Sequence, residues 1–308
     1  MTYIFGPVPS RRLGLSLGID LIPPKTCTYD CLYCQVGRTT CLTVDQEPFV
    51  PAGEVTVELE KVLERFHPDT ITLSGSGEPT LNSEIDQVIS FIKGITETPV
   101  ALLTNGSLLW RKEVRNCVLG ADLIMPTLTT VFENTFRVIH RPHKGLELPM
   151  IIEGFKELRK DYGGLILLEV VLLANINDNK KELEGMKKVI EEIHPDKIQL
   201  NTVVRPPSDS RALSLDMEKL NNIKEFFGDR AEIIATIASK KRTGKYDSWI
   251  ENIVEMSKRR PVTVADIAGV LNITPEESEG ILKGLLLKGI IKKQEHGRNT
   301  FYIARERA

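Results

Sequence analysis

The sequence lacks the features of a secreted or membrane protein. Its 308 residues contain no run of about eighteen apolar residues, which excludes an ordinary transmembrane helix. The start, Met1 to Gly6, lacks the basic segment and the apolar stretch of a secretory signal peptide. The five cysteines are an odd number and do not form a complete secreted disulfide framework. We therefore expect a cytoplasmic protein with no membrane contact.

The sequence also has little excess of charge, but its charge is unevenly distributed. The formal net charge is -2, yet the segment from Ser239 to Ala308 carries +5 and the residues before it carry -7. Such an asymmetry bears on association with partners rather than on the fold. The basic segment therefore indicates a surface with a role of its own.

Three of the cysteines form a compact pattern. Cys27, Cys31 and Cys34 follow one another as CxxxCxxC. Three thiolates can each bind one iron of a 4Fe-4S cube and leave the fourth iron without a protein ligand, whereas structural zinc usually has four protein ligands. The pattern favours an iron-sulfur cluster with an open iron, with a zinc knuckle or a chance group of core cysteines as alternatives. Cys41 and Cys117 stand apart and are expected to be small apolar side chains.

The cysteine segment resembles the signature of radical S-adenosylmethionine (SAM) enzymes, with aromatic Tyr33 directly before the last cysteine. The resemblance implies that SAM chelates the open iron through its methionine amine and carboxylate, and that Tyr33 packs near the adenine. It implies that the reduced cluster cleaves SAM to methionine and a 5′-deoxyadenosyl radical, which abstracts a hydrogen from the substrate. The expected cofactors are a 4Fe-4S cluster and SAM, with reduced flavodoxin or ferredoxin as electron donor.

Short apolar strands alternate with amphipathic helices along most of the chain. Strands are predicted over residues 16–22, 70–74, 100–104, 123–127, 165–173 and 197–204, and helices over 55–66, 84–92, 148–159 and 180–193. Strands that are continuously apolar are typical of parallel sheets buried on both faces, joined by right-handed crossovers. The fold class is α/β, and the family resemblance implies a partial (β/α)6 TIM-like barrel that is open on one side.

The loops after parallel strands converge, and one such loop carries a second signature. The segment from Ser74 to Thr80 is similar to the Gly-Gly-Glu-Pro motif of the family, with Ser76 in place of the usual first glycine. By this resemblance, Gly77, Glu78 and Pro79 are expected near the amino group of SAM. An ordinary polar turn is the alternative.

Four further residues within or directly after predicted strands are candidates for cofactor binding. Asn105 lies in a turn that recurs in the family and faces the cofactor. Glu169 is a carboxylate in an apolar strand and needs a polar partner, either the ribose hydroxyls of SAM or a core arginine or lysine. Thr127 is a candidate for ribose or carboxylate binding, and Asn177 follows the strand that contains Glu169.

Three loops concentrate basic side chains that could face the substrate. They are the segments 6–14, 141–144 and 205–207, which contain Arg11, Arg12, Arg141 and Arg205. Arginines there could hold a phosphate or a carboxylate through bidentate hydrogen bonds. Charges that are simply solvated are the equally open alternative.

The pattern changes beyond Gly244. Helices from Trp249, Thr263 and Thr274 precede an expected hairpin over 289–303, and together they look like a winged helix-turn-helix domain. We expect a radical SAM core domain over residues 1–238 and this second domain over 239–308. The expected recognition helix begins with acidic residues, whereas the wing is basic. Docking to a protein or to the core is therefore favoured over RNA contact, and RNA contact over duplex DNA.

Within the superfamily, the chain resembles proteins grouped with tRNA wyosine synthases, through the segments Asp20 to Pro23 and Arg205 to Pro207. Those synthases bind a second cluster through upstream cysteines, and Met1 to Thr26 contains none. Their pyruvate-dependent reaction is therefore not expected. We predict a radical SAM enzyme whose leading substrate candidate is RNA, ahead of a peptide or a small metabolite. The alternative is a non-catalytic iron-sulfur regulator that binds nucleic acid through its winged helix.

Overall fold

A computed structural model describes residues 2–234 and 249–305 of the chain. Within them, one sheet of eight strands has the order β1-β2-β5-β6-β7-β8-β9-β10. Its strands are β1 (Ile4–Ser10), β2 (Gly14–Ile19), β5 (Thr70–Leu73), β6 (Val100–Thr104), β7 (Leu123–Pro126), β8 (Leu165–Leu172), β9 (Lys197–Thr202) and β10 (Ala231–Ile233). The edge strand β1 is antiparallel to β2, and every other neighbouring pair is parallel. The expected parallel sheet is therefore confirmed.

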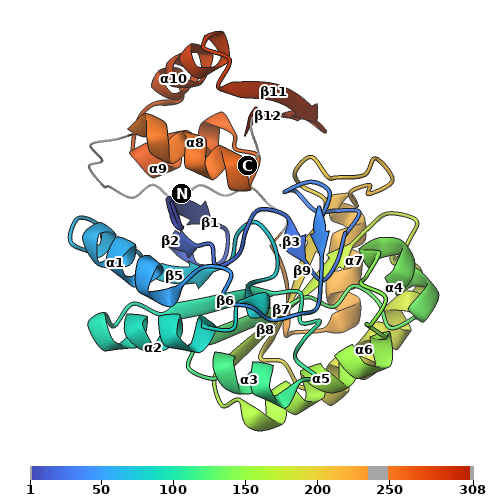
Figure 1. Ribbon diagram of the computed structural model, residues 1–308. Coiled ribbons are helices and arrows are strands. Elements are labelled where there is room, and N and C mark those ends of the chain that lie inside the picture. Colours follow the sequence, from blue (N-terminus) through green and yellow to red (C-terminus); the bar gives the residue numbers. More distant parts are fainter. Residues whose placement is uncertain (1, 235–248, 306–308) are drawn as a thin grey trace.

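Helices cover the outer face of this sheet (Figure 1). They are α1 (Ala52–Leu63), α2 (Ile85–Ile95), α3 (Lys112–Val118), α4 (Glu133–His140), α5 (Leu148–Asp161), α6 (Lys180–Ile193) and α7 (Met217–Phe227). Apolar side chains of the strands and helices meet in one large core, which includes Ile71, Leu102 and Phe155. The result is a mixed α/β fold consistent with a partial barrel. Among the described residues, no helix is both long and apolar enough to cross a membrane.

All six predicted strands are present, and the sheet has two more at its edges. The strand β1 contains Pro7 and Pro9, which lack the N–H that a central strand donates and are therefore tolerated at an edge. The strand β10 is only three residues long and carries little periodic signal. The helices α3, α4 and α7 were also not predicted.

The C-terminal elements lie against the β1 edge of the sheet (Figure 1). They are α8 (Trp249–Arg259), α9 (Val264–Leu271), α10 (Pro275–Leu287), β11 (Ile291–His296) and β12 (Asn299–Ala304). The strands β11 and β12 form an antiparallel hairpin, and Thr274 and Glu277 form a capping box at the start of α10. Both α8 and α9 contact β1. The boundary predicted between residues 238 and 239 lies outside the described residues.

Candidate active site

A cavity of about 390 Å³ opens at the carboxyl ends of the parallel strands. Its volume is in the range of small-molecule sites. Nine of the predicted site residues line it: Tyr33, Gly77, Glu78, Asn105, Thr127, Glu169, Cys27, Cys31 and Cys34. The fold therefore brings the cysteine pattern and the Gly-Glu-Pro segment to one place.

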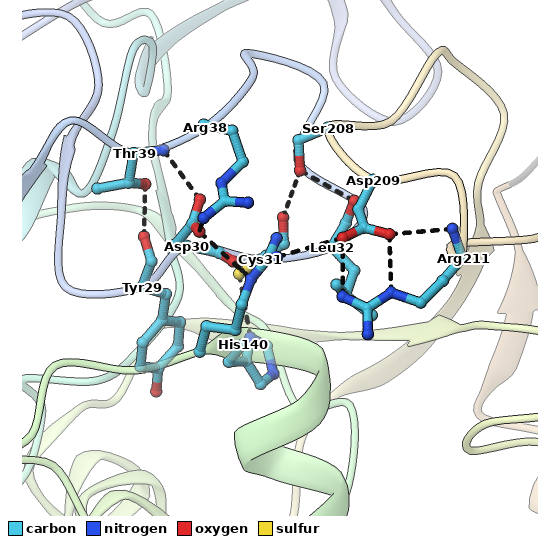
Figure 2. Close-up of polar contacts among 11 residues, drawn as sticks. Tyr29, Asp30, Cys31, Leu32, Arg38, Thr39, His140, Ser208, Asp209 and Arg211 are labelled. Carbon is cyan, nitrogen blue, oxygen red and sulfur yellow. Dashed lines mark hydrogen bonds and ion pairs between the residues drawn. The ribbon is translucent and has the colours of Figure 1, made fainter.

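The cysteine loop is closed by a pair of short strands and held by the segment that follows β9. The short strands β3 (Thr26–Cys27) and β4 (Cys41–Leu42) pair in parallel and form the base of the loop. Figure 2 shows Ser208 above the middle of the loop, where its hydroxyl donates to the carbonyl oxygens of Cys31 at 2.8 Å and Leu32 at 3.0 Å. These bonds fix the backbone that carries Cys31.

Asp30 holds the second half of the same loop (Figure 2). Its carboxylate accepts from the backbone N–H of Thr39 at 2.9 Å and pairs with Arg38 at 2.8 Å. Arg141 reaches the same carboxylate at 3.3 Å and donates to the Asp30 carbonyl at 2.8 Å. Arg141 was one of the basic side chains that could face the substrate, with simple solvation as the equal alternative; in the structure it holds the cysteine loop in place.

Sequence reasoning did not identify His140, which ends α4 and lies beside the cysteines. Its Nδ1 is 3.1 Å from the Sγ of Cys31, and its Nε2 is within hydrogen-bond distance of the Thr129 hydroxyl. The ring of Tyr33 meets it edge-on at 5.9 Å between centroids. Burial lowers the pKa of His140 to about 3, so the imidazole is neutral at physiological pH.

Burial of the thiol groups of Cys27 and Cys31 makes loss of their protons costly. Burial and the nearby Glu78 carboxylate raise the pKa of Cys27 to about 12, and burial raises the pKa of Cys31. Thiols must lose their protons to bind metal, so cluster binding would compensate this cost. The side-chain amide of Asn105 already donates toward the Cys27 sulfur at 3.6 Å.

The donor set fits a cube better than a single ion. In the part of the chain that the structure describes, no three His, Cys, Asp or Glu side chains are grouped closely enough to hold one metal ion. A 4Fe-4S cube binds each cysteine to a different iron and so requires a wider spacing. All three cysteines line the same cavity.

Glu78 joins the loop after β5 to the loop after β6. Its Oε1 accepts from the N–H of Thr80 at 3.1 Å and from the hydroxyls of Thr80 and Thr104 at 2.6 Å each. Its Oε2 accepts from the N–H of Asn105 at 2.7 Å. A carboxylate has about four lone pairs. Since three of the bonds go to Oε1, the side chain retains acceptor capacity on Oε2.

Gly77 packs directly on the cysteine loop. A Cβ at this position would lie 1.8 Å from the carbonyl oxygen of Thr26, the residue before Cys27. The same carbonyl accepts from the N–H of Glu78 at 3.2 Å. Only glycine allows this approach of two backbones, which explains its place in the motif independently of any ligand.

Asp20 is a further residue that the sequence did not identify as part of the site. Its carboxylate accepts from the N–H of Ser76 at 3.1 Å and from the Ser76 hydroxyl at 2.6 Å, and it pairs with Arg259 of α8 at 3.0 Å. Burial raises the pKa of Asp20, while Ser76 and Arg259 oppose that rise. The C-terminal elements are thereby connected to the loop that carries Gly77.

Glu169 was expected to bind either the ribose hydroxyls of SAM or a core arginine or lysine, and it has an arginine partner. Its Oε2 is 3.3 Å from Arg12, and its Oε1 accepts from the side-chain amide of Asn201 at 2.6 Å. Burial would raise the pKa of Glu169, but Arg12, Asn201 and Arg11 together lower it below the ordinary value. The carboxylate also lines the cavity, and its backbone forms a bridge with Thr127.

Two predicted site residues do not join the cavity. Asn177 is completely buried, and its side chain bonds to the carbonyls of Thr129 and Val171 and to the N–H of Leu173. The prediction that Asn177 binds a cofactor is therefore corrected, because its polar atoms are used to fix the loop after β8. Pro79 is buried at the start of the 3-10 helix η1 (Pro79–Leu81), behind Glu78.

Comparison with known proteins identifies relatives of the whole chain. The model of the radical SAM superfamily matches residues 21–186. The UPF0026 protein MJ1312 of Methanocaldococcus jannaschii is 35% identical over 314 residues, covering 98% of this chain and 96% of that protein. The GTPase Obg of Brachyspira hyodysenteriae is 37% identical over 295 residues, covering 94% of this chain but only 43% of that protein. The chain thus spans less than half of the length of this second relative.

Solved structures share the fold at low identity. Streptococcus suis SuiB bound to S-adenosylmethionine superimposes with a TM-score of 0.54 at 13% identity, covering 72% of this chain and 50% of that chain. TYW1 with a bound lysine-pyruvate adduct gives a TM-score of 0.51 at 17% identity, covering 69% of this chain and 72% of that chain. The chain belongs to the radical SAM superfamily, whose members are enzymes that use a 4Fe-4S cluster and SAM and need an electron donor, and it is related over its length to the UPF0026 proteins.

Proposed function

We propose that Cys27, Cys31 and Cys34 hold the 4Fe-4S cluster and that SAM occupies the adjoining cavity. The observation that carries this proposal is that one cavity is lined by all three cysteines and by the Gly77-Glu78 segment. When bound, the cluster supplies the electron that cleaves SAM to methionine and a 5′-deoxyadenosyl radical able to abstract hydrogen. Residues of the chain hold the sulfurs, orient SAM and exclude water.

The sulfurs are oriented by neutral hydrogen-bond donors. Asn105 donates to the Cys27 sulfur, and its amide also donates to the Thr28 hydroxyl at 2.8 Å, which fixes its direction. His140 approaches the Cys31 sulfur from α4. Hydrogen bonds to cluster sulfurs make reduction easier, so we assign this tuning role to Asn105 and His140.

We assign different side chains of the cavity wall to different groups of SAM. The free acceptor capacity of Glu78 Oε2 suits the methionine amine, because a buried carboxylate is stabilised by a cation. Tyr33 offers an aromatic face toward the adenine. Glu169 and Thr127, neighbours across β8 and β7, suit the ribose hydroxyls.

We further propose that the C-terminal elements form a winged helix that docks on the core. Three helices followed by an antiparallel hairpin have the order of that fold. Lys292 of the hairpin lines a small pocket together with Cys34 and Gln35, and His296 lies 3.3 Å from the Val203 carbonyl. The basic hairpin thus faces the cysteine loop, which supports docking on the core over nucleic-acid recognition by that face.

The test is anaerobic reconstitution with iron and sulfide, reduction with dithionite, addition of SAM, and chromatography for 5′-deoxyadenosine. Replacing Cys31 with alanine (Cys31→Ala) should abolish this product and the charge-transfer absorbance of the cluster. The matched control is Cys41→Ala, since Cys41 is exposed and does not line the cavity. Product formation by Cys31→Ala at the wild-type rate would contradict the ligand assignment. A cluster that forms without SAM cleavage would contradict the proposed activity.

A further inference from the structure

Three arginines from separate parts of the chain meet on one wall of the cavity. Arg11 lies in the turn between β1 and β2, Arg205 follows β9, and Arg260 follows α8. Arg205 and Arg260 lie 3.4 Å and 3.1 Å from the two carboxylate oxygens of Asp266. These three arginines are called the arginine cluster below. Arg205 and Arg260 share the buried carboxylate of Asp266, and the carboxylate of Glu169 acts on both Arg11 and Arg12.

In the part of the chain that the structure describes, the hydrogen bonds that hold the Arg11 side chain go only to uncharged groups. Arg11 donates to the carbonyl oxygen of Ile234 at 2.7 Å and to the Asn201 side chain at 3.4 Å. When Arg12 is included, four guanidinium groups face the two carboxylates of Asp266 and Glu169, so this wall has a surplus of two positive charges among the described residues. Burying such a surplus is costly unless a counter-charge is present.

Arg259, the remaining arginine of the cavity wall, does not add to this surplus. Arg12 pairs with Glu169 at 3.3 Å, and Arg259 pairs with both Asp20 at 3.0 Å and Glu255 at 2.6 Å. The surplus therefore lies around the arginine cluster and Arg12 rather than along the whole wall.

One donor of the cluster is also left without a partner. Among residues 2–234 and 249–305, the buried Nε of Arg260 finds no hydrogen-bond acceptor. Burial lowers the pKa of Arg260 to about 10, and burial together with Arg205 lowers the pKa of Arg11 to about 10. Both side chains still carry their charge at neutral pH, so among the described residues the cluster keeps uncompensated positive charge and one donor without an acceptor.

We propose that the arginine cluster binds a phosphate monoester group of the substrate. A phosphate monoester carries close to two negative charges at neutral pH and three acceptor oxygens, which matches the surplus. A carboxylate or a phosphodiester would compensate only half of it. Arginine suits this role because its planar fork forms bidentate bonds with phosphate oxygens. The inference rests on the proposed function, because it places the phosphate on the cavity that holds the cysteines.

Binding can be measured without turnover. The full chain, reconstituted anaerobically, is titrated calorimetrically with inorganic phosphate, dimethyl phosphate and acetate at pH 7.5, once without SAM and once saturated with SAM. We expect phosphate to bind most tightly, with an affinity that falls as salt is raised. The variant Arg11→Gln should bind phosphate about 10- to 100-fold more weakly, as expected for the loss of a charged hydrogen-bond donor.

Two controls make the result specific. Arg137→Gln removes the same charge from an exposed side chain on α4 and should leave phosphate binding unchanged. Arg11→Lys keeps the charge but not the fork, and should recover only part of the affinity. Circular dichroism confirms that each variant is folded.

Several outcomes would overturn the inference. They are equal binding by wild type and a folded Arg11→Gln, preference for acetate or dimethyl phosphate, and phosphate binding that disappears on saturation with SAM. The last would assign the arginine cluster to the SAM carboxylate. SAM cleavage with no phosphate binding rejects the inference but leaves the proposed function standing. Phosphate binding without SAM cleavage rejects the proposed function but leaves the anion site standing.

Discussion

Replacing Arg259 with methionine tests whether the C-terminal elements hold the loop that carries the Gly77-Glu78 segment. The guanidinium of Arg259 is paired with Asp20 at 3.0 Å, and the exposed fractions of the two side chains are 8% and 6%. It also donates to the carbonyl of Thr2 at 2.7 Å and lies 4.9 Å from the centroid of the Phe5 ring. Methionine keeps the aliphatic packing but removes the charge and its donors.

The expected loss of stability is large because the partner cannot be solvated. Breaking a buried ion pair by removing one member costs about 3–5 kcal/mol, since the remaining charge stays buried. Asp20 would retain only its two bonds from Ser76. The matched control is Lys258→Met, the preceding residue of α8, whose ion pair with Glu255 is partly exposed and worth at most about 1 kcal/mol.

Urea unfolding followed by circular dichroism measures both variants. The double variant Asp20→Asn/Arg259→Met should be more stable than Arg259→Met alone, because it removes the unpaired charge. We also expect weaker SAM binding by Arg259→Met, since Asp20 positions Ser76. A loss no greater than that of Lys258→Met, or no recovery in the double variant, would refute the reasoning.

The pH dependence of Arg259→Met has a definite sign. Burial already raises the pKa of Asp20, and removing Arg259 would raise it further. A carboxyl group whose pKa is higher in the folded state binds its proton more tightly when folded, so its ionisation destabilises the fold as the pH rises through that pKa. The stability lost by the variant should therefore be greatest above this pKa and should shrink as the pH is lowered through it.

Two further predictions concern the cysteine loop. Gly77→Ala would place a Cβ 1.8 Å from the Thr26 carbonyl oxygen and should prevent stable cluster assembly. The control Gly53→Ala, with open space around its Cβ, should be neutral or stabilise α1 by up to about 1 kcal/mol. Iron content and thermal melting measure both variants, and normal iron content in Gly77→Ala would contradict the packing argument. His140→Phe removes the contact to the Cys31 sulfur and should lower the reduction potential of the cluster. A redox titration followed by electron paramagnetic resonance measures this potential, and an unchanged value would argue against a hydrogen bond from His140 to Cys31.

The central fold could be predicted because its strands have a strong local signal. A run such as Leu165–Leu172 is apolar except for Glu169, and this is typical of parallel strands covered by helices. The strand Ile4–Ser10 has no such signal, because Pro7 and Pro9 interrupt it. Its place at the edge, antiparallel to β2, follows from tertiary pairing.

Some residues of the candidate site could also be predicted from the sequence, and others could not. Residues that directly follow strands, such as Glu78 and Asn105, could be placed together because the loops of a parallel barrel converge. Asn177 also follows a strand, yet its amide fixes its own loop, and no sequence rule separates these two uses of an asparagine. His140 ends a helix and reaches Cys31 only through the packing of α4.

The C-terminal arginines show why a sequence divided into domains can conceal a composite site. Lysines and arginines are common in the last turn of a helix, where they stabilise the helix dipole, so Arg259 and Arg260 carried no signal of function. The packing of α8 on β1 changes their role, because it brings both side chains to the cavity wall. Arg205 then donates to the Pro261 carbonyl at 3.0 Å and joins the core to the same segment. A cavity whose charge comes from both parts of the chain is complete only while they stay docked, so any change that weakens docking should reduce anion binding and SAM binding together.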